Sequence, residues 1–363
     1  MHIFDRLHNY LVRQFFKGFF TVYMGLAFVV LLFDSVELMR RASGRSFVPF
    51  RTILEMGLLK LPQMMEMLLP FVFLFGAMFT FWRLNRAHEL VVIRTGGVSV
   101  WQFLKPALAV AALWGILQVT LFNPFSAALY AKYSQLEAKY FERGIYQSFI
   151  STDGLWIRQI ETDFTMILHA NVVEPDLSLR EINAFIFDPS FVFQRRIDAD
   201  TARLSEGSWT FDRVTVTEQS GTRKMLPTLQ IISSLTLDKI QESFAPPESL
   251  SVWKLPGFIT VLENSGFSAM PHRLYFHSML TTPFMLMAMV LIAACFTISP
   301  ARNQKTMLLI VGGIFCGFLF YTFSDIVHAL GGSGRIPVIF AAWAPFFITA
   351  FLGVATLLHN EDG

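Results

Sequence analysis

Six long apolar segments alternate with polar connections along this chain, and they fall into two groups of three. Each has close to the roughly 20 residues that a helix needs to cross a bilayer. A backbone in contact with lipid must satisfy its own hydrogen bonds, so these segments predict six membrane-spanning helices. The predicted spans are Gly18–Phe33 (extending to about Leu38), Leu61–Trp82, Trp101–Phe122, Leu274–Ser299, Thr306–Ser324 and Ile336–Leu358.

The first segment has an alternative interpretation as a secretory signal, because Arg6, Arg13 and Lys17 precede it. Its length and the lack of a clear small-x-small cleavage site favour a span. The predicted organisation is therefore residues 1–125 with spans one to three, an inserted domain at 133–251, a linker at 252–272, and spans four to six at 273–363.

The inserted domain, residues 133–251, shows the period-two alternation of β-strands. Ile182, Ala184 and Ile186 share one face of a predicted strand, with Phe185 and Phe187 on the other. Such short strands between turns predict a sandwich, a jelly roll or an open barrel. Apolar residues on both faces fit a groove for an apolar ligand or an ordinary sandwich core, and both remain open.

Lysine and arginine favour the cytoplasmic side of short membrane loops. With six spans both termini share one side, and more of these residues lie there, which predicts cytoplasmic termini and an external β domain. The terminal side carries Arg6, Arg13, Lys17, Arg83, Arg86, Arg94, Lys105, Arg302 and Lys305, and the opposite connections carry Arg40, Arg41, Arg45, Arg51 and Arg335. The outer cluster from Arg40 to Arg51 is the exception, and it is a candidate site for an anionic group.

Two connections have helical spacing. Leu84, Ala87 and Val91 predict a short cytoplasmic helix near 84–97, with Glu89 projecting among Arg86 and Arg94. Such a helix is either a docking element for another protein or a solvated interfacial helix. In the linker, an apolar stripe predicts a helix on the membrane surface that ends at Gly266. That stripe consists of Leu255, Phe258, Ile259, Leu262 and Phe267.

Catalytic motifs are largely missing from the sequence. It has no G-x-x-x-x-G-K-[ST] loop, so we expect no nucleotide hydrolysis by this chain alone. His88-Glu89 begins like a zinc-protease motif, but Val92 replaces the second histidine. Cys295 and Cys316 lie in predicted spans, and a net charge of +2 gives no nucleic-acid footprint. His272 and His277 are too far apart for one helix face.

The order of several short motifs resembles the LptF/LptG permease family of the lipopolysaccharide exporter, and within it the LptG branch. The two branches share fold and topology, so the sequence does not separate them with certainty. The motifs are Val36–Ala42 (VELMRRA), Glu89–Ser99 (ELVVIRTGGVS), Gly154–Arg158 (GLWIR), Leu255–Phe258 (LPGF), Gly266–Ser278 (GFSAMPHRLYFHS), Ser324–Pro337 and Ala341–Pro345 (AAWAP).

The resemblance implies a fold and a set of partners. It implies a periplasmic β-jelly-roll-like domain between the triplets of spans, in the inner membrane of a Gram-negative bacterium. The expected partners are an LptB-like ATPase dimer, an LptF-like second permease, LptC-like and LptA-like bridge proteins, and lipopolysaccharide. ATP and magnesium would bind the ATPase, and no cofactor is expected in this chain.

The resemblance also implies roles for individual residues. Glu89 matches the glutamate of the family's coupling helix, flanked by Arg86 and Arg94. Arg40 and Arg41 match basic positions that would hold lipid A phosphates, with Arg45 nearby; Asp34, where relatives carry a basic residue, is a departure that would repel phosphate if it faced the cavity. Acyl chains would lie against Phe33, Phe71 and Phe75.

Three other functions remain open. A permease of this architecture could export another amphiphile, such as a lipoprotein. A membrane enzyme would need an acid/base or metal cluster, for which only His272 and His277 are available. An assembly or sensor protein would bind a partner through the β domain without coupling to an ATPase.

Overall fold

The computed structural model describes residues 2–42, 48–141, 155–161, 163–174, 178–205, 207–233, 246–264, 268–297 and 306–362. These residues form two compact units. The first comprises residues 1–133, 248–253 and 270–363, and the second comprises 134–247 and 254–269.

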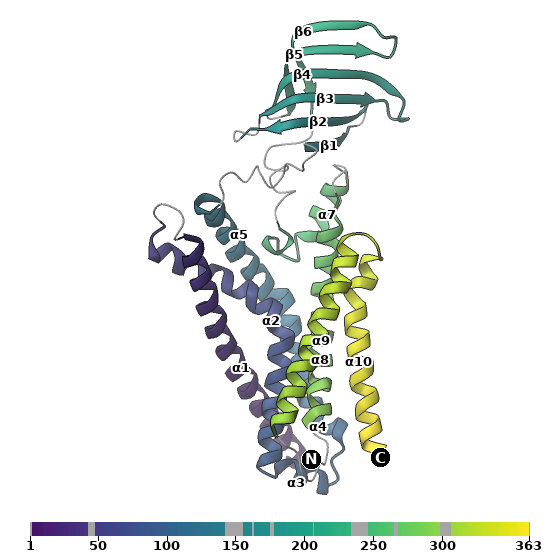
Figure 1. Cartoon of the computed structure of the whole chain (residues 1–363). Coiled ribbons are helices and arrows are strands. Elements are labelled where there is room, and N and C mark those ends of the chain that lie inside the picture. Colours follow the sequence, from purple (N-terminus) through teal and green to yellow (C-terminus); the bar gives the residue numbers. More distant parts are fainter. Residues whose placement is uncertain are drawn as a thin grey trace. The chain divides into compact units, whose positions relative to one another are not determined.

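The first unit contains the membrane-spanning helices (Figure 1). Among the described residues, six stretches are long and apolar enough to cross a bilayer, three before the sheet and three after it, which confirms the predicted arrangement. The helices are α1 (His2–Ala42), α2 (Phe50–Arg86), α3 (Glu89–Thr95), α4 (Val100–Leu117), the π-helix η1 (Gln118–Phe122), α5 (Asn123–Tyr140), α8 (Met270–Thr297), α9 (Thr306–Gly332) and α10 (Val338–Asp362). The third span therefore runs through α4, η1 and the start of α5.

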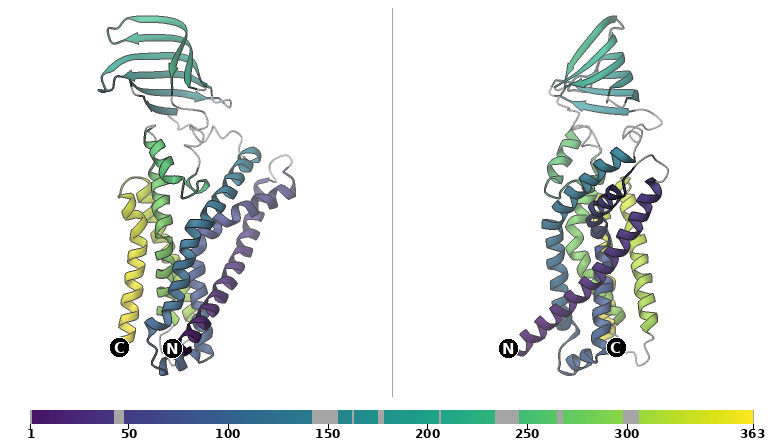
Figure 2. Two further views of the ribbon diagram at one scale, coloured as in Figure 1. Left: turned by 180° about the vertical axis from the view of Figure 1, so that it is seen from behind. Right: turned by 90° about the vertical axis from the view of Figure 1, so that its left-hand side faces the viewer.

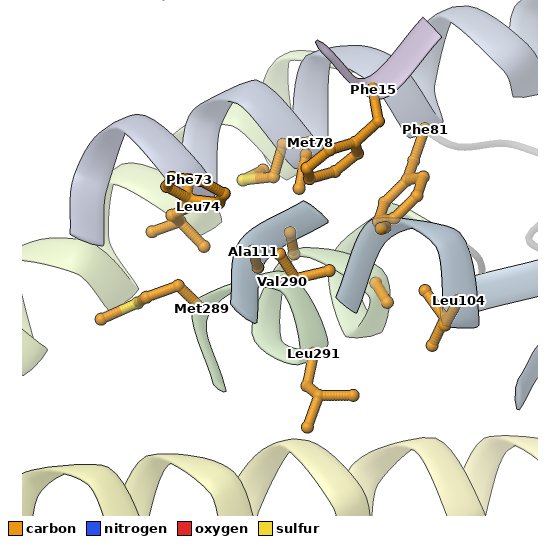
Figure 3. Close-up of a cluster of buried hydrophobic side chains, with 14 of the residues drawn as sticks. Phe15, Phe73, Leu74, Met78, Phe81, Leu104, Ala111, Met289, Val290 and Leu291 are labelled. Carbon is orange, nitrogen blue, oxygen red and sulfur yellow. The ribbon is translucent and has the colours of Figure 1, made fainter. Parts of the chain in front are cut away.

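The core of this unit lies where α1, α2, α4 and α8 meet (Figure 3). Phe19 of α1 places its ring centroid 4.6 Å from that of Phe73 in α2 and 4.8 Å from that of Trp114 in α4. Val290 of α8 is fully buried in the same cluster. Lipid tails are as apolar as these side chains, so close van der Waals packing drives the association of the helices.

Two glycines allow the helices to approach this closely. A Cβ atom on Gly115 of α4 would lie 2.4 Å from the Cα atom of Pro283 in α8. A Cβ atom on Gly76 of α2 would lie 3.0 Å from the Cα atom of Phe19 in α1. Both neighbours are backbone atoms that cannot rotate away, so each helix pair depends on its glycine.

In its described residues, the second unit contains one antiparallel sheet whose six strands pair in sequence order (Figures 1 and 2). The sheet confirms the predicted β domain, and in one of its hairpins Leu204 pairs with Trp209. Helix α5 continues to Tyr140, beyond the predicted start of the domain at Tyr133, and the first strand in the described residues is β1. The strands are β1 (Leu155–Ile160), β2 (Thr165–Val173), β3 (Leu179–Phe187), β4 (Phe193–Ser205), β5 (Ser208–Glu218) and β6 (Arg223–Ile232).

One face of this sheet is a buried apolar core. Ile182, Ala184 and Ile186 are buried on that face as predicted, together with Trp209 and Phe211. The alternation shifts by one residue at Glu181 in β3 and at Arg213 in β5, which both have positive φ values. Such bulges return the following residues to the same face, so the long strands keep one apolar side.

The linker forms the 3₁₀-helix η3 (Pro247–Ser249) and the helix α7 (Leu255–Asn264). Leu255 and Leu262 are buried, and Phe258 and Ile259 are partly buried, so the predicted stripe lies on one face of α7. Gly266 and Phe267 lie outside the described residues.

Candidate functional site

The first candidate site is the C-terminal end of α1, where the predicted phosphate-binding arginines lie. Arg40 and Arg41 occupy the last turn of α1, and both side chains are exposed. The Arg40 guanidinium donates two hydrogen bonds of 2.8 Å to the carboxylate of Glu37, one turn earlier. Arg45 lies outside the described residues. At the C-terminal end of α1, the Arg40 guanidinium is therefore oriented to bind a carboxylate group.

Asp34, which would repel phosphate if it faced a cavity, forms an ion pair with a lysine from the next span. The Lys60 Nζ atom of α2 lies 2.7 Å from Asp34 Oδ1, and Asp34 is only 8% exposed. The same ammonium group lies 5.4 Å from the centre of the Tyr133 ring in α5. Because Asp34 is buried and paired, its charge does not oppose an anion bound at Arg40.

Lys60 was missing from the predicted outer charges because it directly precedes the second apolar segment. Asp34 is the signal in the sequence that could have indicated Lys60, because it is an acid at the end of an apolar segment with no evident local partner. A carboxylate buried in a span needs a nearby cation or hydrogen-bond donor. Lys60 adds one charge to the side opposite the termini, so the excess of lysine and arginine on the terminal side is smaller than predicted but keeps its direction.

The second candidate site is α3, the short helix between spans two and three. It lies at the same end of the helical unit as both chain termini (Figures 1 and 2). The helix begins at Glu89, later than the predicted start near Leu84. His88 adopts a left-handed conformation with φ of 58°, which ends the preceding α2 and separates the two helices. Leu84 and Val91 therefore belong to different helices, and their predicted common stripe is wrong.

Glu89 forms a hydrogen bond with a residue of α1. Its Oε2 atom accepts a 2.7 Å hydrogen bond from the Tyr10 hydroxyl of α1. Arg86 lies over the Trp82 ring at 5.4 Å, and Arg94 is exposed at the end of α3. Tyr10 is 79 residues away from Glu89 in the sequence, and no local pattern indicates the contact.

The remaining faces of α3 have distinct roles. Leu90 is buried, and Ile93 packs against the helical core. Val91 and Val92 are 52% and 68% exposed, and Arg94 is exposed beside them. The helix is thus held by one face and presents an apolar ridge with a basic edge on the other.

The three predicted acyl-contact residues lie in two places. Phe71 and Phe75 stack on each other along α2 with ring centroids 6.3 Å apart, and Phe71 lies 5.9 Å from the Tyr321 ring of α9. Phe33 is 74% exposed on α1. No ring contact joins Phe33 to the other two in the described part of the chain, so the structure brings together only Phe71 and Phe75.

Comparison with known proteins decides the family. Residues 9–359 match the family described as "Lipopolysaccharide export system permease LptF/LptG". The chain belongs to the LptF/LptG family. It is 25% identical over 358 residues to the lipopolysaccharide export system permease protein LptG of Haemophilus influenzae, covering 94% of this chain and 95% of that protein. The LptG protein of Escherichia coli K12 is 25% identical over 296 residues, covering 79% of this chain and 80% of the relative.

Membership of the LptF/LptG family agrees with the structure. The family match extends over both triplets of spans and over the sheet between them. The chain is thus a multi-pass membrane protein of permease type, and the resemblance noted in the sequence is confirmed. The roles of Arg40, Arg41, Glu89 and the phenylalanines stay predictions.

Proposed function

We propose that this chain is a permease subunit of an ATP-driven exporter. It extracts lipopolysaccharide from the outer leaflet of the inner membrane and passes it to a periplasmic bridge. The observation that carries this proposal is the family match across residues 9–359, which includes every span and the β domain. Both termini and α3 face the cytoplasm, and the β domain faces the periplasm, in agreement with the excess of arginine and lysine on the terminal side.

Lipid A phosphates would bind at the outer end of α1. Arginine forms bidentate hydrogen bonds with phosphate as it does with carboxylate. Arg40 already makes that arrangement with Glu37, so a phosphate group can take the place of the Glu37 carboxylate. Arg41 is exposed one residue further, and Arg45 would extend the cluster. The pairing of Asp34 with Lys60 removes the repulsion that an isolated carboxylate would add.

Energy would come from an LptB-like ATPase dimer, which binds ATP and magnesium. The helix α3 is the element offered to it, because Val91, Val92 and Arg94 are exposed at the cytoplasmic end. An exposed apolar ridge on a short helix fits a groove on a partner protein. Glu89, held by Tyr10, would link this docking surface to α1 and thereby to the lipid site.

A second, LptF-like permease would complete the cavity for the acyl chains. Phe71 and Phe75 supply stacked rings beside α9, and Phe33 is exposed on α1. In the β domain, the apolar face is buried, so it must open before an acyl chain can enter. Strands β1 and β6 form the two outer edges of the described sheet, on which LptC-like or LptA-like β domains would add.

The test is mass spectrometry of the tagged protein, purified gently from its native membrane, with proteins and lipids scored together. The proposal predicts an ATPase, a second six-span permease and lipid A. Recovery of the chain alone with bulk phospholipid would contradict it. Enrichment of a lipoprotein in place of lipid A would favour export of another amphiphile, and a β-domain partner without an ATPase would favour an assembly or sensor role.

A further inference from the structure

A buried polar cluster lies where the third span changes from α-helix to π-helix. The π-helical turn η1 spans Gln118–Phe122, and Asn123 follows it with no exposed surface. Turns of this kind disturb the regular backbone ladder and occur frequently at functional sites. Here the carbonyl oxygen of Thr120 accepts a 3.2 Å hydrogen bond from the indole nitrogen of Trp253. That residue belongs to the connection through which the chain returns from the β domain.

Asn123 links this connection to three spans. Its Oδ1 atom accepts a 2.8 Å hydrogen bond from the backbone N–H of Val252. Its Nδ2 group donates to Glu66 Oε1 of α2 at 3.1 Å and to the Tyr275 hydroxyl oxygen of α8 at 3.0 Å. The Glu66 carboxylate accepts from the amide nitrogen, so it fixes which end of the Asn123 amide points toward Val252.

Glu66 of α2 is a buried acid within the second span. It is 8% exposed, and its Oε2 atom accepts no hydrogen bond from the described residues. No cation pairs with it in the described part of the chain; the neighbouring groups are polar and neutral apart from the acidic Glu248. A buried acid of this kind in a span is costly and marks a functional position.

We propose that Glu66 and Asn123 are positioning residues. They fix the segment Glu248–Trp253, by which the chain returns from the β domain, against the π-helical turn of the third span; we call this attachment the seat. The seat has two attachment points, Val252 on Asn123 and Trp253 on Thr120, and Glu66 orients the first of them. Spans two, three and four thus hold the chain at the point where it re-enters the helical unit. In the exporter proposed above, a shift of these spans would move that connection with them.

Hydrogen exchange of the Val252 amide tests the seat directly. The full chain would be measured in lipid nanodiscs by mass spectrometry, using peptides that cover residues 248–253. Asn123→Ala and Glu66→Ala should raise exchange of this amide about tenfold, because a buried hydrogen bond is lost. Glu66→Gln should leave it within about twofold of the wild type, because its amide oxygen still accepts from Asn123.

Lys132→Ala is the matched control, since it breaks an exposed ion pair with Glu55 that joins the same two helices outside the cluster. Trp253→Phe, at a residue that is 67% exposed, should also raise exchange of residues 251–253 without affecting folding. Unchanged exchange in Asn123→Ala or Trp253→Phe would overturn the seat. Equal exchange in Glu66→Gln and Glu66→Ala would overturn the positioning role of Glu66.

The role in transport rests on the proposed function and has its own measurement. In proteoliposomes with the ATPase and the second permease, Asn123→Ala should keep ATP hydrolysis and deliver less lipid, with Glu66→Gln close to wild type. Normal delivery by Asn123→Ala would overturn this role. Absence of lipid delivery by the wild type would refute the exporter assignment, whereas the exchange experiment would still decide the seat.

Discussion

The Lys60 Nζ atom of α2 lies 2.7 Å from the Asp34 Oδ1 atom of α1, and the two residues close an ion pair between the first and second spans. The Asp34 side chain is 6% exposed, and that of Lys60 is 24% exposed. Water therefore screens the pair only weakly. This contact joins α1, which carries Arg40 in its last turn, to α2, which leads into α3.

Removing one partner of this pair should destabilise the protein more than removing both. Lys60→Met leaves Asp34 buried without its cation, at a cost of about 3 kcal/mol. The double variant Asp34→Asn/Lys60→Met should recover most of that loss, because no charge remains buried. Thermal unfolding in detergent measures both effects. If the double variant lost as much stability as the two single variants together, Asp34 and Lys60 would not stabilise each other.

Glu89→Ala should weaken attachment of the ATPase without unfolding the chain. The change removes the carboxylate that Tyr10 holds at the start of α3, while Leu90 still anchors the helix in the core. The amount of ATPase that co-purifies measures the effect, with the thermal midpoint as a check on folding. Tyr10→Phe removes the same hydrogen bond and should give a smaller loss. Unchanged co-purification by Glu89→Ala would remove the coupling role.

Arg40→Glu combined with Arg41→Glu should lower lipid occupancy and spare assembly. Both side chains are exposed at the end of α1, so the reversal of charge acts on a bound anion and not on the core. Lipid A per purified complex, measured by mass spectrometry, gives the readout. Arg335→Glu, between α9 and α10, is the matched control and should keep wild-type occupancy. Normal occupancy in the double variant would exclude a phosphate clamp.

Gly115→Val should disrupt the packing of α4 on α8. Its Cβ atom would fall 2.4 Å from the Pro283 Cα atom, and overpacking of this kind typically costs about 1–3 kcal/mol. Gly25→Val is the control, because no atom lies within 4 Å of the Cβ position there. The expected result is a lower thermal midpoint for the Gly115 variant alone. Equal midpoints would mean that the two helices separate easily.

The sequence predicts the spans and the strands well because both follow from local periodicity. Apolar runs such as Thr306–Ser324 indicate a span by their length and lack of charge. The alternating residues Ile182, Ala184 and Ile186 indicate the buried face of a strand. Local patterns fail where one residue breaks a helix. The left-handed conformation of His88 divides a stretch of helical spacing in two. Histidine is enriched among residues with positive φ, but most histidines are not left-handed, so the residue type alone does not predict the break.

The candidate site is harder to predict because its contacts join distant positions. Lys60 lies 26 residues from Asp34, and Tyr10 lies 79 residues from Glu89, so only packing of the spans brings them together. Single-residue signals were present in the sequence: Asp34 and Glu66 are acids in or beside apolar segments. They indicate that a polar partner exists without identifying it.

Transfer of lipopolysaccharide from proteoliposomes tests the central claim most directly. The chain would be reconstituted with its second permease and the ATPase, and release of labelled lipid to a soluble periplasmic acceptor would be followed. The account predicts ATP-dependent transfer that needs this chain and falls in the Glu89→Ala variant. Transfer that does not depend on ATP, or that is equal without this chain, would contradict it.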